Sequence, residues 1–380
     1  MIYLDNAATT FPKPQIVLKS VNEAVKFYGG NPGRSGHKLS LKTSQRIFSV
    51  RESTARFFHA QTENVIFTSN CTHSLNMAIK GAMQKGGHII LSQLEHNSVI
   101  RPIVALAKRG IIQYDIAPVY EGDIQQTIQS FASFIRKDTT AIVCTHASNV
   151  TGMIMPIEQL GQLCRQYGIL FIVDAAQTAG VLPIDMQKMN IDILCTAGHK
   201  GLYGITGTGL MILNSNIVLD TLIEGGTGSV SIDVNQPDFL PDRYESGTIN
   251  TVGILSVGAG ISHIQKLTLE RIYHHEFQLC LSLYEGFKQI PNIITYIHHF
   301  QKGQFVPIVL FNIEGKSSME VVEQFSQRNW CLRGGLHCSP LIHQALGTAD
   351  IGAVRVSPSI FSTQNEIYAF LKELKQIAKI

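Results

Sequence analysis

The sequence lacks the features that mark several large classes of protein. Its 380 residues contain no apolar run approaching the roughly 20 residues needed to cross a bilayer, and residues 1–5 do not begin a basic and then apolar leader. The net charge is only +3, and the basic residues form no stripe that would suit nucleic acid or a lipid surface. We therefore expect no signal peptide, no membrane span and no nucleic-acid partner.

Paired cysteines and metal or nucleotide motifs are also missing. The seven cysteines are odd in number and form no Cys-x-x-Cys pair, which is typical of reduced thiols in a cytoplasmic protein. The pairs at 274–275 and 298–299 are histidines without metal-ligand spacing, and we interpret them as surface features. The glycines of segment 204–209 form neither a GxGxxG motif nor a P-loop. No metal or nucleotide site is expected.

The chain has the composition of a well-packed globular protein and an alternation of strand and helix patterns typical of an α/β fold. Hydrophobic residues make up 44% of it and charged residues 16%. Apolar runs without polar alternation at 65–67, 88–91, 141–144, 169–173 and 191–194 are typical of strands buried on both faces of a parallel sheet. Amphipathic stretches lie between them, one with Val17, Val21, Ala24, Val25 and Tyr28 at helical spacing.

The pattern changes after about residue 265. Two strand-like runs appear at 306–312 and 353–356, and Ser317-x-x-Glu320 and Thr363-x-x-Glu366 are capping boxes that begin helices. We predict a large domain at 15–265, with a mostly parallel sheet flanked by helices. A smaller α+β domain is expected to combine residues 266–380 with residues 1–14, because that polar start comes too early to join the main sheet.

Polar clusters follow the five predicted strands, at 68–73, 93–97, 145–149, 174–177 and 196–200. In parallel sheets, ligands bind beyond the carboxyl ends of the strands. One crevice is therefore expected to collect all five clusters.

Asp174 and Lys200 are the most informative pair in that crevice. A carboxylate at one strand end, with a lysine 26 residues later at the next strand end, suits pyridoxal 5′-phosphate (PLP). The carboxylate would keep the pyridine nitrogen protonated, and the amine would form the Schiff base. His199 is a basic neighbour that should lower the pKa of the lysine. Taken alone, Asp174 would be interpreted as a helix N-cap, with Gln177 completing the cap, and it is Lys200 at the next strand end that favours the cofactor.

Two further segments suit an anion and a ring. Residues 69–73 precede a predicted helix, so the backbone N–H groups there, with the Thr72 hydroxyl, would cradle a phosphate; ordinary N-capping is the alternative. His96 would lie over the pyridine ring or simply satisfy a loop hydrogen bond. Cys71 is interpreted as a backbone donor in the phosphate loop.

The loop 333–340 carries a candidate nucleophile. Cys338 follows two glycines and lies in sequence beside His337 and Arg333, a setting that predicts an exposed, mobile and easily deprotonated thiol. The other cysteines sit mostly in apolar contexts and are expected in the core. Arg355, on a strand-like run, would hold a substrate carboxylate, or else form a surface salt bridge.

These residues together resemble the class V (fold type I) PLP-dependent enzymes, in the branch of cysteine desulfurases and selenocysteine lyases. The likeness runs from residues 3–10, through 174–177 and 198–200, to 352–363. The Arg-x-Gly-x-His-Cys pattern at 333–338 is similar to that of the SufS-like group.

The resemblance implies a role for each matched residue. Lys200 would carry the PLP imine, with Asp174 at the ring nitrogen, Gln177 at the ring oxygen and His96 stacked on the ring. Thr72 and His199 would bind the phosphate, and Thr248 would do so from the second subunit of a homodimer. His37, Asn149, Arg333 and Arg355 would face L-cysteine or L-selenocysteine. Cys338 would take the sulfur as a persulfide, release alanine, and pass the sulfur to an acceptor protein.

Three positions depart from the family pattern. Ala197 replaces a hydroxyl residue that contacts phosphate, Gly201 is an extra glycine after the lysine, and Leu336 stands where a second histidine is common. The alternatives are a selenocysteine lyase, a class V aminotransferase or β-lyase that does not use Cys338, and a non-catalytic scaffold. The cysteine loop argues against the second, and the full set of cofactor residues against the third.

Overall fold

A seven-stranded sheet organises the larger part of the chain. The computed structural model describes residues 1–33, 36–214 and 217–379. The strand order is β2-β8-β7-β6-β5-β3-β4, and all strands are parallel except β8, which is antiparallel to both neighbours. The strands are β2 (Val65–Thr68), β3 (Gly87–Ser92), β4 (Ile112–Ala117), β5 (Thr139–Thr145), β6 (Leu170–Asp174), β7 (Ile193–Ala197) and β8 (Gly209–Leu213).

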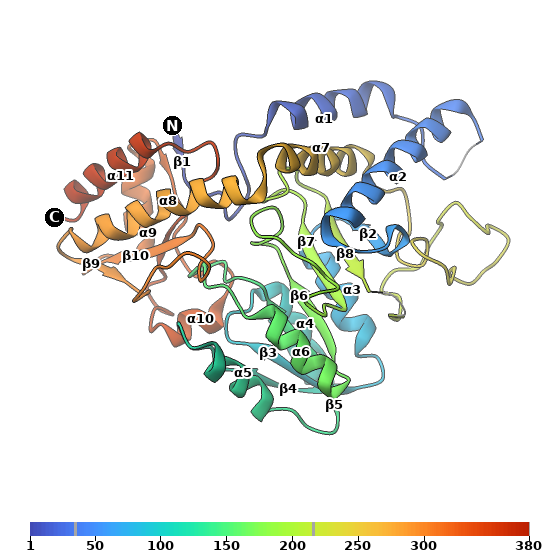
Figure 1. Ribbon diagram of the computed structural model, residues 1–380, viewed down its shortest axis with the longest axis horizontal. Helices are drawn as coiled ribbons and strands as arrows, with labels where there is room; N and C mark the ends of the chain where they lie inside the picture. Colours follow the sequence, from blue (N-terminus) through green and yellow to red (C-terminus); the bar gives the residue numbers. More distant parts are fainter. Residues whose placement is uncertain (34–35, 215–216, 380) are drawn as a thin grey trace.

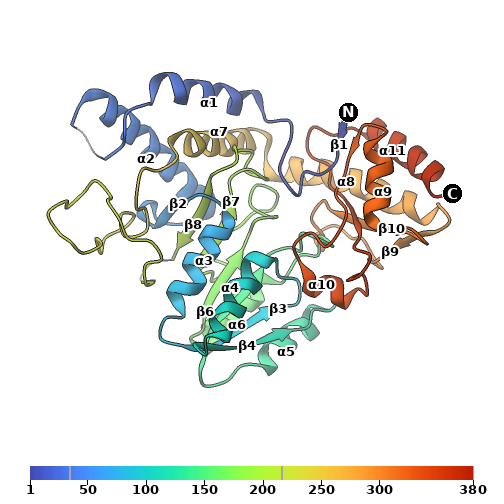
Figure 2. The same ribbon diagram turned by 180° about the vertical axis from the view of Figure 1, so that it is seen from behind.

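Helices cover both faces of this sheet, as Figures 1 and 2 show from opposite sides. Alternate residues of β6 enter different cores: Phe171 and Val173 join the core under α2, α6 and α7, whereas Ile172 joins the core under α3 and α4. Burial on both faces explains why these strands are apolar throughout. The helices are α1 (Gln15–Phe27), α2 (Lys38–Phe58), α3 (Cys71–Ala82), α4 (Asn97–Lys108), α5 (Ile124–Ser133), α6 (Ile157–Tyr167) and α7 (Thr251–Leu267), with a short 3-10 helix, η1 (Thr62–Asn64).

A smaller layer of strands and helices follows α7. A three-stranded antiparallel sheet, β12-β10-β9, packs with α8, α9 and α11 around its own hydrophobic core (Figure 1). The elements are α8 (Leu269–Lys288), β9 (Ile293–Thr295), β10 (Val309–Ile313), α9 (Ser318–Ser326), β11 (Trp330–Cys331), α10 (Pro340–Ala345), β12 (Val354–Val356) and α11 (Gln364–Ile377). Both expected capping boxes are present, at Ser317 and Thr363.

The N-terminal residues join this second layer, as expected. Strand β1 (Ile2–Tyr3) pairs in parallel with β11, and Asp5 forms a bridge with Ser357. The chain then crosses to the large sheet, where the Thr10 hydroxyl donates to the carbonyl of Lys200. Residues 5–10 therefore lie between the two sheets. The division at 15–265 stays a prediction.

Two expected elements are present but differ in detail. In α1 the buried residues are Val17, Ser20 and Ala24, whereas Val25, expected on the same face, is 67% exposed. The run 191–194 was expected to be a strand, and the strand is there but begins at Ile193. Within the described ranges, no helix is both long and apolar enough to cross a membrane.

Candidate active site

A cavity of about 230 Å³ opens at the carboxyl ends of the parallel strands, where the polar clusters were expected to meet. Strands β2, β3, β5, β6 and β7 all end near it, and the smaller layer closes it with residues 333–355. Eleven of the thirteen expected site residues line it. They are Cys71, Thr72, His96, Asn149, Asp174, Gln177, His199, Lys200, Arg333, Cys338 and Arg355.

Asp174 and Lys200 form the polar floor of the cavity. Asp174 ends β6 and is 4% exposed, and its Oδ1 accepts from the backbone N–H of Ala176 at 2.9 Å. Burial raises the pKa of Asp174, opposed by the Ala176 hydrogen bond and by Lys200. Burial likewise lowers the pKa of Lys200, while Asp174 raises it. Each group thus stabilises the charged form of the other in a desolvated site.

The alternative reading of Asp174 as a helix N-cap is wrong. Turns, not a helix, follow the aspartate. Gln177 does not close a cap either, because its Nε2 donates to the carbonyl of Ala7 at 3.1 Å. The polar start of the chain is therefore tied to the turn after β6, and it brings Ala7 and Ala8 into the cavity wall.

The N-terminus of α3 points its free donors at the same cavity. The Asn70 side chain caps the helix by accepting from the N–H of His73 at 2.8 Å. Ordinary capping is thus real, but it uses only one of the first N–H groups of the helix, and those of Cys71 and Thr72 precede the intrahelical ladder. The Cys71 thiol donates to Asp174 at 3.5 Å, and burial raises its pKa well above the usual value. Cys71 therefore contributes a neutral side chain as well as its backbone.

Two neutral histidines flank Lys200. Burial, with a smaller contribution from Lys200, lowers the pKa of His96 to about 4. Nδ1 of His96 accepts from the N–H of Ser98 at 3.1 Å and caps α4, so the ring both satisfies its loop and faces the cavity. Burial also lowers the pKa of His199 to about 4. Our expectation that His199 acts as a cation beside Lys200 was wrong, because burial is what lowers the lysine pKa.

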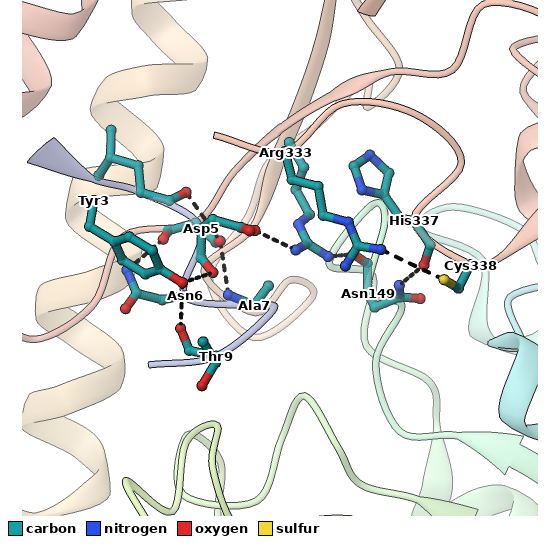
Figure 3. Close-up of polar contacts among 12 residues, drawn as sticks. Tyr3, Asp5, Asn6, Ala7, Thr9, Asn149, Arg333, His337 and Cys338 are labelled. Atoms are coloured by element: carbon teal, nitrogen blue, oxygen red, sulfur yellow. Dashed lines mark hydrogen bonds and ion pairs between the residues drawn. The ribbon is translucent and has the colours of Figure 1, made fainter. Parts of the chain in front are cut away.

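Cys338 lies at the mouth of the cavity, and it is the one exposed cysteine among the residues that the structure describes. Nη2 of Arg333 lies 3.6 Å from the sulfur of Cys338. Figure 3 shows the two side chains pointing toward each other. The backbone carbonyl of Cys338 accepts a hydrogen bond from the N–H of Asn97 at 2.7 Å. The backbone carbonyl of His337 accepts one from Nδ2 of Asn149 at 2.8 Å. The thiol is therefore held over the cavity by contacts of its loop with the start of α4 and with the turn after β5.

His337 does not tune the thiol, contrary to our expectation. Its ring is buried and its Nε2 bonds to the carbonyl of Ala353 at 3.0 Å, away from the sulfur (Figure 3). Burial lowers the pKa of His337 well below its usual value, so the ring is neutral. Arg333 is the cation beside the sulfur.

Arg355 is a buried cation, so the alternative of a surface salt bridge is wrong. Its side chain is 1% exposed and pairs with Asp5 at 2.7 Å across 350 residues of sequence. Nη1 donates to the carbonyl of Asn149 at 2.8 Å. Within the described part of the chain, its Nε has no hydrogen-bond partner. The guanidinium thus lines the cavity, and its two bonds to Asp5 and Asn149 use only two of its five N–H groups.

His37 and Thr248 lie outside this cavity. His37 caps α2 by accepting from the N–H of Ser40 at 3.2 Å. The Thr248 hydroxyl accepts from Asn31 at 3.4 Å at the surface. Their expected roles stay predictions.

Ser98 and Thr145 also line the cavity but were not predicted as site residues. Thr145 belonged to an expected polar cluster and was recognisable by that position. Ser98 carried no distinguishing signal, since a serine in the first turn of a helix is common.

The chain matches known proteins over nearly its whole length. A family model described as aminotransferase class-V matches residues 2–370. A probable cysteine desulfurase of Pyrococcus abyssi is 30% identical over 388 residues, which cover 100% of this chain and 94% of that protein. The cysteine desulfurase IscS of Vibrio vulnificus is 30% identical over 397 residues, covering 100% and 93%. The apo cysteine desulfurase of Thermococcus onnurineus superposes with a TM-score of 0.91 at 28% identity, covering 100% and 94%.

Proposed function

The chain belongs to the aminotransferase class-V family and groups there with the cysteine desulfurases, and we propose that it converts L-cysteine to L-alanine with PLP, transferring sulfur to Cys338. One observation carries the proposal. An exposed thiol beside the guanidinium of Arg333 stands at the mouth of a cavity whose floor holds Lys200 and Asp174. An aminotransferase would have no use for that thiol.

The residues present fit PLP. The buried carboxylate of Asp174 suits a protonated ring nitrogen, and the desolvated amine of Lys200 suits an imine. The N-terminus of α3, with Thr72, suits the phosphate, and His199 would add a hydrogen bond. The neutral ring of His96 is free to stack. When bound, PLP supplies an electron sink for negative charge at the α-carbon of the amino acid.

The chain's own residues would perform the remaining steps. Arg355 would bind the substrate carboxylate, and Asn149 lies beside it in the cavity wall. The neutral amine of Lys200 would remove the α-proton and later return it. The Cys338 thiolate would attack Sγ of the substrate: the S–S bond forms, the C–S bond breaks, and the alanine fragment keeps the electron pair until it is protonated.

The test is incubation of the purified protein with L-cysteine. We expect alanine and, with a reductant present, sulfide in equal amounts. Cys338→Ala should abolish sulfide while the absorbance of bound PLP persists, and Cys331→Ala is the matched control, a partly buried cysteine outside the cavity. A keto-acid product, or full turnover by Cys338→Ala, would contradict the proposal. L-selenocysteine run in parallel decides between the two substrates.

We further propose that the protein is a cytoplasmic homodimer of two-domain subunits, with the domain boundary near residue 265. Thr248 supports the dimer, because it is exposed and lies outside the cavity of its own chain. A second subunit would bring its Thr248 to this cavity and complete the phosphate contacts. The persulfide would pass from Cys338 to an acceptor protein, since the thiol is exposed.

A further inference from the structure

A second cavity lies behind the turn after β5, on the side away from the candidate active site. Its wall combines the loop before α5, the start of α6 and residues 303–305 of the smaller layer. Among the described residues, none lines both this cavity and the active-site cavity. A cavity of about 150 Å³ is large enough for benzene. At about 260 Å³, the second cavity therefore has room for a ring with a short side chain.

His146 points into the second cavity and not into the active site. Thr145 and Ala147 line the active-site cavity, whereas His146, between them, lines the second one. Successive side chains of an extended segment point to opposite sides, and Ala147 is paired with Ile154 as in a strand.

The ring of His146 is buried without a polar partner. It is 4% exposed, and burial lowers its pKa to about 4, so it is a neutral imidazole with one donor and one acceptor. Within the described part of the chain, Nδ1 has no hydrogen-bond partner, and Nε2 forms no hydrogen bond either. Unpaired polar atoms are costly to bury, so a polar group bound in the cavity would stabilise the ring.

The first turn of α6 supplies unpaired donors to the same cavity. Its N-cap is Pro156, and no side chain caps the helix. The N–H of Ile157 donates to the carbonyl of Met155 at 2.8 Å, whereas those of Glu158 and Gln159 have no partner among the described residues. Such N–H groups point out of the helix start and bind oxygen acceptors. The residues that carry them line the cavity.

The rest of the wall is largely apolar and favours an uncharged ligand. Among the described residues, the charged members of the wall are Asp123 and Glu158. Asp123 accepts from the N–H of Gln126 at 2.8 Å, and Glu158 pairs with Lys188 at 3.6 Å. An anion would meet two carboxylates and no lining cation, and a cation would face the free N–H groups of α6. The large apolar members are Met153, Ile154, Met155, Met189 and Phe305.

We propose that this cavity is a binding site for a small uncharged amide. The carbonyl oxygen of the amide accepts from the start of α6, and its N–H group donates to the ring of His146. The apolar part of the ligand lies against the three methionines, whose flexible side chains adapt to its shape. An amide fits because it joins an acceptor and a donor without net charge. The site requires neither PLP chemistry nor sulfur transfer, so it stands or falls independently of the proposed function.

The experiment is titration of the purified protein with 3-phenylpropanamide, followed by NMR of ¹³C-labelled methionine methyl groups. We expect one molecule to bind and the signals of Met153, Met155 and Met189 to shift most, because these residues line the cavity. Met77 and Met211, in the core under α3, should not shift. 3-Phenylpropanoate and 3-phenylpropylamine have the same ring and chain but carry a charge, and they should bind about tenfold more weakly or worse.

A variant and a matched control test the role of the histidine. His146→Phe keeps the bulk of the ring and removes both nitrogens, so it should weaken binding of the amide by about two- to tenfold. His343 is also buried, with a pKa lowered to about 4 and an unpaired Nε2, but it does not line this cavity. His343→Phe should therefore leave the affinity unchanged.

The unmodified protein can refute the proposal even if His146→Phe does not fold. No binding, or the largest shifts at methionines outside the cavity, would overturn the site. Equal affinity for the amide and its charged analogues would overturn the assigned ligand class, as would full affinity in a folded His146→Phe. Loss of cysteine desulfuration alone would count against the proposed function and not against this site.

Discussion

Removing the carboxylate of Asp5 is the sharpest test of how the site is assembled. Asp5 pairs at 2.7 Å with Arg355, and the side chains are 19% and 1% exposed, respectively. Asp5→Asn keeps an oxygen that accepts a hydrogen bond but leaves a buried guanidinium without its counter-charge. Breaking a buried ion pair in this way costs about 3–5 kcal/mol, and the retained bond to the Asn149 carbonyl favours the lower end, about 3 kcal/mol.

That loss is measurable as a shift in melting temperature. An unfolding entropy of about 2.1 cal/mol/K per residue amounts to about 0.8 kcal/mol/K for this chain, so we expect Tm to fall by about 4 °C by circular dichroism. Asp138→Asn is the matched control, because its 2.6 Å pair with Arg136 is 55% and 37% exposed. It should shift Tm by less than about 1 °C. Equal shifts in the two variants would refute the claim that Arg355 depends on Asp5.

Three further outcomes are expected. Arg333→Gln removes the cation 3.6 Å from Cys338, so alkylation by anionic iodoacetate should slow severalfold relative to neutral iodoacetamide; an unchanged ratio would show that the guanidinium does not act on the sulfur. A Cβ on Gly260 would clash with the carbonyl oxygen of Leu202, so Gly260→Ala should lower the free energy of unfolding by about 1–3 kcal/mol in urea denaturation, whereas Gly29→Ala, with open space, should not. Four histidines have a pKa lowered to about 4, chiefly by burial: His96, His146, His199 and His343. The unfolded chain protonates these histidines at a higher pH than the folded chain does, so the free energy of unfolding should fall as pH drops from about 6.5 toward 4. The fall should be up to about 1.4 kcal/mol per pH unit for each histidine. NMR signals of these rings titrating near pH 6.5 would contradict the prediction.

The sequence predicted the central strands because burial on both faces leaves a direct mark. At 89–91, 141–144 and 171–173, in β3, β5 and β6, the residues that point to either face of the sheet are apolar and lie in one of the two hydrophobic cores. Strand β4 carried no such mark, since it lies at the edge of the sheet and is only partly buried between Ile112 and Ala117. Strand β8 was also missed, although residues 210–213 are apolar and every residue of the strand is buried; what the sequence did not carry is its antiparallel direction, which depends on pairing with β2 and β7.

The sequence predicted the site residues that are placed by their position at the end of a strand. It did not predict the direction in which a side chain points or the partner that it contacts. Asp174 ends β6, His96 and Lys200 lie shortly after β3 and β7, and all three line the cavity. The orientation of His337 was not recoverable, because neighbours in sequence need not face each other. The same limit applied to Arg355, whose partner lies 350 residues away.

The geometry of the cysteine loop joins the two halves of the chain in one functional unit. His337 and Cys338 both have positive φ, 50° and 60°, which costs a non-glycine residue about 1–2 kcal/mol. Such strain persists only where the surroundings fix it. Here the fixing bonds come from the N–H of Asn97, at the start of α4, and from the side chain of Asn149, in the turn after β5. The residue before Asn97 is His96, which lines the cavity. The start of α4 therefore positions His96 in the cavity wall and also holds the backbone of Cys338. Because those bonds form only when the smaller layer is docked, the thiol reaches its place over the cavity only in the assembled molecule.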